Sequence, residues 1–415
     1  MQAPSTKIDW LSIGQLSAGI LSCLITFSLA GLLVFLGVSG VLAKSNSLMD
    51  ITAVFMLAGL IAAVGILNIP SIILSARCLS GKQFEPKLKT SSFRQASFAL
   101  ISLPVCLLGG QWISGTTLAA WLLPWFNILA LLIPIWWLVE FGRRQLPSGS
   151  PQRSWGLVSV SLGITPLITI LAELIVTVLV VLIVFMALGV DPIWMDRFNQ
   201  LFIQFNQAEI DPQFFATFFK DLLASPLVIT AIFVTVGFLM PLTEELLKPL
   251  GLWSLRKRLL TPAEGFSGGL ICGAGFALIE SATMIAQTGG SADWGKIVVL
   301  RIGTSLLHMT ASGFVGWGLA SAWRQKKYGR TMLTILAATA VHGLWNSMAI
   351  LIVLLPLLSS AGAQSVLMQN LQGIGTSTLA SILTFVAIAL FLLNRRLRRE
   401  TQSSPAEVNP PPSVG

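Results

Sequence analysis

The sequence predicts an all-α fold, a polytopic integral membrane bundle of about ten transmembrane helices. Of its 415 residues, 54% are hydrophobic and 10% are charged, whereas charged residues make up about a quarter of a typical soluble domain. The hydrophobic residues form blocks of about 20 to 28 residues between charges, and this length crosses the ~30 Å hydrocarbon core of a bilayer. These observations exclude an ordinary soluble enzyme and a disordered chain.

Ten apolar blocks are expected to be the membrane spans. They lie near residues 17–43, 51–76, 95–111, 116–140, 157–190, 223–254, 266–288, 297–323, 331–357 and 376–394. The first block is longer than the core of a signal peptide and lacks a small-residue cleavage site, so we expect it to remain as a span. The first five spans form a membrane region at 17–190, and the next four form a second region at 223–357.

The basic residues predict the orientation of the spans. If the spans alternate in direction, 20 of the 26 Lys and Arg residues fall on the side of both termini, and five fall on the other side, including Arg301. Because basic residues accumulate in cytoplasmic loops, both termini are expected in the cytoplasm. This topology accounts for the net charge of +9, and no soluble domain is expected that would bind nucleic acid.

The segments outside the spans give few further signals. Residues 1–16 are expected to be a cytoplasmic N-terminus, and 191–222 an outer loop of acidic and aromatic residues with an amphipathic helix at the membrane surface. The last span and its preceding loop occupy 358–394, and a basic, then proline-rich cytoplasmic tail at 395–415 is expected to be disordered. The four cysteines are scattered, which predicts neither a disulfide framework nor a thiolate metal site.

The ionisable residues inside the spans are concentrated in one half of the chain. A charged side chain at the centre of a span costs about 3 kcal/mol on insertion scales, so it is by default a functional candidate. The fifth span has Glu173, and spans six to nine contain Glu244, Glu245, Lys248, Glu280, His308 and His342, which include both histidines of the chain. Counted from the cytoplasmic ends of their spans at about 1.5 Å per residue, Glu244, Glu280 and the two histidines lie about 18 to 24 Å deep. Four successive helices therefore bring polar groups to nearly one level.

The spacing of residues within these spans indicates shared faces and close helix contact. Glu244 and Lys248 are four residues apart, as are Phe276 and Glu280, and each such pair shares a helix face. Small residues repeat every four positions in the seventh span (Gly265, Gly269, Gly273) and in the eighth (Ser312, Gly316, Ala320). This pattern lets two helix backbones approach closely, which would bring the polar groups together.

Carboxylates, imidazoles and an amide in a dry environment are suited to hydrolysis. A buried Glu near a cation and a His is suited to act as a general base on water, and His and Asn are suited to donate hydrogen bonds to an oxyanion. Two His and a Glu are also a known catalytic zinc ligand set. The H-E-x-x-H spacing of common zinc proteases is absent, so a zinc mechanism and a metal-free mechanism both stay open.

Four motifs occur in order on successive spans: E-E-x-x-K at 244–248, F-x-x-x-E at 276–280, a lone His308, and H-x-x-x-N at 342–346. In this order they resemble the PrsW family of intramembrane proteases, relatives of the CAAX-processing and bacteriocin-processing proteases. The resemblance covers residues 240–350. It implies an endopeptidase of the bacterial plasma membrane that cuts membrane-anchored proteins, with members associated with cleavage of anti-sigma factors, and it makes 223–357 the catalytic four-helix core.

The resemblance also implies roles for single residues in the first and last motifs. Glu244 would be the general base, with Glu245 in support. His342 and Asn346 would hold the oxyanion.

The middle motifs depart from the relatives. The CAAX-processing relatives have His where this chain has Glu280, so His308 is expected to orient the water, and Glu280 to act as a second acid or a ligand. Zinc is the metal expected if one is bound, held by His308, His342 and Glu280. Lys248 and Phe276 would support the site.

The main alternative is a secondary transporter or proton-coupled carrier that uses the same Glu and His residues as a relay. Transporters usually show two related halves with interrupted helices in matching positions, but here the polar residues lie nearly all in one half. Each residue alone also has a packing explanation, such as a helix-stabilising pair of Glu244 and Lys248. Five such residues at one depth favour a site. The residues predict no oligomeric state.

Overall fold

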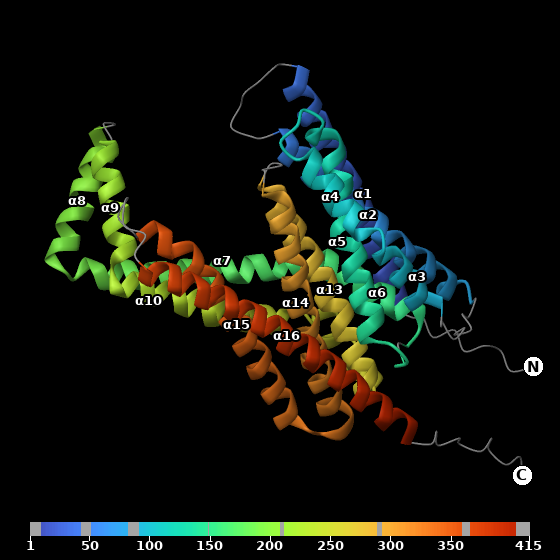
Figure 1. Cartoon of the computed structure of the whole chain (residues 1–415). Coiled ribbons are helices and arrows are strands. Elements are labelled where there is room, and N and C mark those ends of the chain that lie inside the picture. Colours follow the sequence, from blue (N-terminus) through green and yellow to red (C-terminus); the bar gives the residue numbers. More distant parts are fainter. Residues whose placement is uncertain are drawn as a thin grey trace, which may run out of the picture. The chain divides into compact units, whose positions relative to one another are not determined.

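The computed structural model describes residues 10–42, 51–81, 91–147, 149–207, 211–288, 293–358 and 366–403, and these residues form helices and turns with no strand (Figure 1). The first helices are α1 Trp10–Leu42, α2 Ile51–Leu79, α3 Ser91–Leu100, α4 Leu103–Ile113, α5 Ala119–Gly142, α6 Pro151–Leu162, α7 Ile164–Gly189, α8 Pro192–Gln207 and α9 Pro212–Ala224. They are followed by α10 Pro226–Val234, the π-helix η1 Thr235–Leu239, α11 Met240–Leu247, α12 Leu250–Trp253, the 3-10 helix η2 Arg256–Arg258, α13 Pro262–Ala286, α14 Trp294–Gln325, α15 Tyr328–Leu358 and α16 Val366–Ser403.

Ten helical segments among the described residues are long and apolar enough to cross a membrane. The prediction of an all-α membrane protein with about ten spans is therefore confirmed. The cytoplasmic location of both termini stays a prediction from the charges.

Three of the predicted spans contain breaks. The third divides into α3 and α4, where Pro104 lies in the first turn of the second helix. Proline suits that turn because the N–H group that it lacks would have no partner in the helix. The fifth divides into α6 and α7 at Gly163, and the sixth comprises α10, η1, α11 and α12, with Pro249 just before α12. Hydrophobic length predicts these spans but not the breaks within them.

The last helix is longer than predicted. α16 runs to Ser403, past the expected end of the span at 394. Its Arg and Glu residues favour helix, and Arg396 pairs with Glu400 one turn later at 2.8 Å. The first nine residues of the expected tail are thus helical, while 404–415 lie outside the described residues, as do residues 1–9 of the N-terminus.

The predicted outer loop contains two helices, α8 and α9, where one amphipathic helix was expected. The two helices pack through aromatic rings, since the ring of Phe218 lies 6.1 Å from that of Trp194 and 5.8 Å from that of Phe198. An ion pair of 2.6 Å between Arg197 and Asp221 also joins them. The aromatic residues that marked this loop in the sequence therefore form a small core of their own.

The described helices form two compact units that do not follow chain order. The first unit comprises the chain up to Pro166, Lys248–Thr334 and the chain from Val386, and the second comprises Leu167–Leu247 and Ile335–Phe385. α7, α15 and α16 each run from one unit into the other. The predicted grouping into 17–190 and 223–357 followed the chain, whereas α13 packs against α2, α5 and α6 in the first unit.

The centre of the first unit is the contact between α13 and α14, which lie side by side (Figure 1). α13 is buried along most of its length. A Cβ atom added to Gly273 would lie 2.6 Å from the carbonyl oxygen of His308 and 2.7 Å from the Cα atom of Met309, both too close for a real contact. The glycines at 265, 269 and 273 therefore place the two helix backbones in contact, as the small-residue pattern predicted.

This packing predicts that Gly273→Ala destabilises the protein. The added methyl group meets backbone atoms and not a flexible side chain, so the helices must separate, at a cost of about 1–3 kcal/mol. Thermal unfolding of the purified protein in detergent is expected to show a lower midpoint than in the wild type. Gly31→Ala is the matched control, because a Cβ atom at Gly31 has no heavy atom within 4 Å. Equal midpoints for the two variants would contradict the close contact.

Candidate active site

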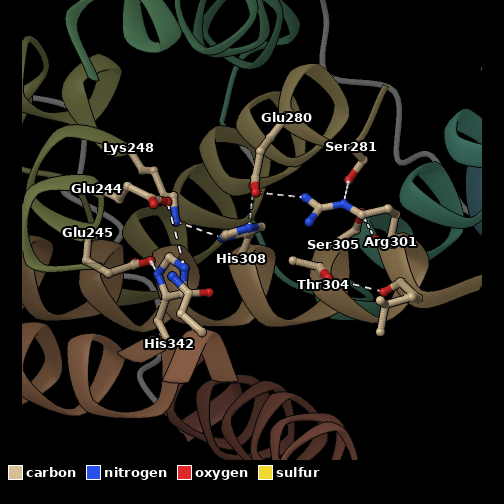
Figure 2. A network of polar contacts seen from close by, with 12 residues as sticks. Glu244, Glu245, Lys248, Glu280, Ser281, Arg301, Thr304, Ser305, His308 and His342 are labelled. Atoms are coloured by element: carbon tan, nitrogen blue, oxygen red, sulfur yellow. Dashed lines mark hydrogen bonds and ion pairs between the residues drawn. The ribbon is translucent and has the colours of Figure 1, made fainter. Parts of the chain in front are cut away.

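Two clusters of polar side chains contain all the predicted site residues, and Figure 2 labels the Glu, His and Lys residues among them. The Lys–His cluster belongs to the first unit and comprises Lys248, Phe276, Glu280, Arg301 and His308. The Glu–His cluster belongs to the second unit and comprises Glu244, Glu245, His342 and Asn346.

Lys248 is a fully buried residue of the Lys–His cluster. Its Nζ atom lies 2.7 Å from Nδ1 of His308 and 4.6 Å from the centre of the Phe276 ring. An ammonium group only donates hydrogen bonds, so Nδ1 is the acceptor, and the face of an aromatic ring attracts a cation. The imidazole and the phenyl ring therefore form a binding place for a positive charge.

Both ring nitrogens of His308 have partners in this cluster. Nε2 lies 2.6 Å from Oε2 of Glu280, and Nδ1 accepts from Lys248. Because an ionised carboxylate only accepts hydrogen bonds, the pattern assigns the ring proton to Nε2 and describes a neutral imidazole. Glu280 therefore fixes both the orientation and the tautomer of His308.

Arg301 belongs to this cluster, although the distribution of basic residues in the sequence predicts an outer position for it. Its Nη2 atom lies 2.9 Å from Oε1 of Glu280, and its Nε–H donates to Oγ of Ser281 at 3.2 Å. Counting charges assigns a basic residue near the end of an apolar block to the loop. A signal was nevertheless present, because Arg301 precedes His308 by seven residues, two helical turns, and so shares its face of α14.

His342 lies next to two carboxylates in the Glu–His cluster. Its Nδ1 atom is 3.1 Å from Oε1 of Glu245, and its Nε2 atom is 3.9 Å from Oε2 of Glu244. Glu245 is fully buried, and Glu244 and His342 are nearly so. The first distance is a hydrogen bond that orients the ring, and the second is longer than a hydrogen bond. The predicted base and a predicted oxyanion residue therefore lie beside each other.

A π-helix directly before α11 contributes to the position of this cluster. η1 has the wider i→i+5 turn that is frequent at functional sites. Asn346 on α15 donates from Nδ2 to the carbonyl oxygen of Val236 at 3.3 Å. Gly237 and Gly343 lie so close that a Cβ atom on Gly343 would overlap the carbonyl of Gly237. Val236 and Gly237 of the π-helix are therefore held against α15. These contacts lie close in sequence to Glu244 on one side and to His342 on the other.

The segment that contains both clusters matches a known family. A family model described as PrsW family intramembrane metalloprotease matches residues 165–371, about half of the chain. The chain belongs to the PrsW family of intramembrane proteases. Comparisons with curated proteins and with solved structures gave no match. The PrsW match includes every predicted site residue, confirms the resemblance drawn from the motifs at 240–350, and decides for a protease over a transporter.

The PrsW description implies a metal, and the donor groups of this chain fit one. Zinc in proteins takes imidazole nitrogens and carboxylate oxygens, and a metal-bound histidine usually gives its other ring N–H to a carboxylate. Both histidines have such a carboxylate, Glu280 on His308 and Glu245 on His342. The nitrogen that each histidine would offer to a metal is then Nδ1 in His308 and Nε2 in His342. A metal on Nδ1 would have to replace Lys248 as the partner of that atom.

The contact between Glu245 and His342 predicts the effect of substitutions at Glu245. Glu245→Leu removes the group that orients the imidazole and is expected to lower the cleavage rate about 10–100-fold. Glu245→Gln keeps an acceptor oxygen for Nδ1–H, so it is expected to retain most of the activity. Initial rates in liposomes, with thermal midpoints as a check of folding, measure the difference. A folded Leu variant with wild-type rates would show that Glu245 does not orient the ring.

Proposed function

We propose that this PrsW-family protease cuts membrane-anchored proteins in the bacterial plasma membrane by means of a water molecule that Glu244 activates. Substrates of the anti-sigma-factor type, cut in regulated proteolysis, fit this activity. One observation carries the proposal: Glu244 lies beside His342 within a segment that matches a protease family. Two groups that differ in acid–base character, buried at the same place, are what peptide hydrolysis requires.

Glu244 is proposed to be the general base. It takes a proton from water as the water oxygen bonds to the scissile carbonyl carbon, and it gives this proton to the leaving nitrogen when the C–N bond breaks. Removal of one water proton by a positioned carboxylate contributes about 10²–10⁴-fold to the rate of such reactions.

His342 and Asn346 are proposed to stabilise the oxyanion. In its doubly protonated form His342 donates Nδ1–H to Glu245 and Nε2–H to the substrate oxygen, and the carboxylates of Glu244 and Glu245 balance its charge. The Nδ2 group of Asn346 has two hydrogens, of which one binds the Val236 carbonyl. The other is suited to donate to the same substrate oxygen.

The Lys–His cluster is proposed to orient the attacking water through Nδ1 of His308, where the water takes the place of Lys248 as the donor. Glu280 holds the imidazole ring, and Lys248 and Phe276 support it. This role is proposed because these residues of the cluster belong to the motifs of a protease family. A zinc ion held by the imidazoles would acidify its bound water and polarise the carbonyl group, and a histidine that holds it gives up N–H donation from the metal-bound nitrogen.

The proposal predicts that Glu244→Gln abolishes proteolysis, with a loss of at least about 100-fold, because the amide cannot accept the water proton. The purified protein is reconstituted in liposomes with single-span membrane proteins extracted from bacterial membranes. New N-termini are then identified by mass spectrometry. Wild-type protein is expected to generate cleavage products that the variant does not.

Glu173→Gln is the matched control for this substitution. Glu173 is also a carboxylate inside a span, on α7, and none of the family motifs includes it. The Glu173→Gln variant is expected to cleave at the wild-type rate. If Glu244→Gln cleaves as well as Glu173→Gln, then Glu244 is not the base.

Together with the family description as a metalloprotease, the zinc proposal predicts about one zinc ion per chain in the purified protein. Metal analysis by mass spectrometry is expected to find this zinc in the wild type and to find it lost in His342→Ala. Treatment with a chelator is expected to stop cleavage, and added zinc to restore it. A metal-free protein that remains folded and active after chelation would show that Glu244 activates the water without a metal.

A further inference from the structure

We propose that Arg301 is a positioning residue of the active site, which holds Glu280 so that Glu280 in turn fixes the ring of His308. This inference rests on the proposed role of His308 in orienting the water. Nothing in the family motifs includes Arg301, and it lies four residues into the predicted eighth span.

One guanidinium group holds two neighbouring residues of α13. Nη2 of Arg301 lies 2.9 Å from Oε1 of Glu280, and its Nε–H donates to Oγ of Ser281 at 3.2 Å (Figure 2). The backbone carbonyl of Arg301 also accepts a hydrogen bond from Ser305 at 2.8 Å, one turn later. The planar guanidinium presents its donors in a fixed geometry. Its contact with Ser281 fixes its position against α13, and its contact with Glu280 then fixes the position of the carboxylate.

The two oxygens of Glu280 serve different partners. Oε1 binds Arg301, and Oε2 lies 2.6 Å from Nε2 of His308. The Glu280 side chain is 31% exposed, whereas those of Arg301 and His308 are 10% and 1% exposed. Glu280 is thus the least enclosed member of the chain of contacts. Packing restrains it least, and the ion pair with Arg301 restrains one of its oxygens so that the other faces the imidazole.

The energetics of burial also favour a positioning role. A buried ion pair usually stabilises a protein no more than apolar residues of the same volume would, because both ions lose their hydration. The glycine contact already joins α13 to α14, so stability alone does not call for a second link there. Lys296, on the same helix, illustrates the alternative: it pairs with Asp293 at 2.7 Å while 85% exposed, where a charge is cheap.

The test compares Arg301→Gln, Arg301→Lys and the control Lys296→Gln in liposomes. Arg301→Gln is expected to lower kcat about 10–100-fold, as is usual for residues that orient a site histidine, with KM changed less than about twofold. Arg301→Lys keeps the ion pair with Glu280 but loses the fixed fork, so it is expected to recover part of kcat. Lys296→Gln is expected to match the wild type.

A spectroscopic measurement distinguishes positioning from a purely structural role. The chain has two histidines, so a protein labelled with ¹⁵N-histidine gives two imidazole spin systems, and His342→Gln assigns them. The wild type is expected to show His308 protonated at Nε2 and unprotonated at Nδ1. Arg301→Gln is expected to give a mixture of the two tautomers, while Arg301→Lys retains the wild-type form.

A double variant tests whether Arg301 acts through Glu280. If it does, Glu280→Gln with Arg301→Gln has the same kcat as Glu280→Gln alone, because the effects of two residues that act in series do not add. This double variant also removes both charges, so it keeps the test available if Arg301→Gln fails to fold. Additive losses of kcat, or a His308 spectrum that Arg301→Gln leaves unchanged, would overturn the proposal. Failure of the proposed function would instead appear as cleavage by Glu244→Gln, with the His308 spectra unaffected.

Discussion

The close approach of α13 and α14 is the contact on which the Lys–His cluster depends. Apolar side chains gain little from packing together in lipid, so helices in a membrane associate through van der Waals contact and hydrogen bonds across small residues. Here Gly273 lies against the carbonyl of His308 itself. The residue that allows the backbones to touch is thus next to the residue that the cluster orients, and Glu280, two turns further along α13, reaches His308 across the same contact.

The absence of water in the bilayer imposes a second constraint on both clusters. An unpaired charge is costly there, and in each described cluster ionisable groups contact one another. Lys248 contacts a neutral ring nitrogen and an aromatic face, Arg301 contacts Glu280, and His342 contacts Glu245. The groups that the proposed reaction would use therefore also lower one another's energetic cost of burial inside the membrane.

This pairing affects how substitutions in the site are interpreted. Removal of one partner leaves the other buried and unpaired, so a single substitution measures the lost function together with that penalty. Replacements that keep an acceptor or a charge, and double variants that remove both partners, separate the two effects. For this reason the distinction between a positioning residue and a structural one at Arg301 depends on comparing variants and not on the size of one loss.

Much of the fold, and the grouping of residues in the candidate site, could be predicted because hydrophobic length and helical spacing are local properties of the sequence. Hydrophobic length predicts the spans. Helical spacing predicts which residues share a helix face with Glu244 or with Glu280. The burial of Arg301, the π-helix at 235–239 and the pairing of α8 with α9 depend on contacts between distant segments, which no local pattern contains. The same is true of the division into two units.

The E-E-x-x-K motif joins the two kinds of chemistry that the clusters provide. The boundary between the units falls between Leu247 and Lys248, so the acidic end of the motif belongs to one unit and the basic end to the other. The acidic end supplies two carboxylates next to His342, and the basic end supplies the cation that contacts His308. One short motif therefore contributes carboxylates to the Glu–His cluster and a cation to the Lys–His cluster, so a single substitution within it alters one cluster and leaves the side chains of the other in place.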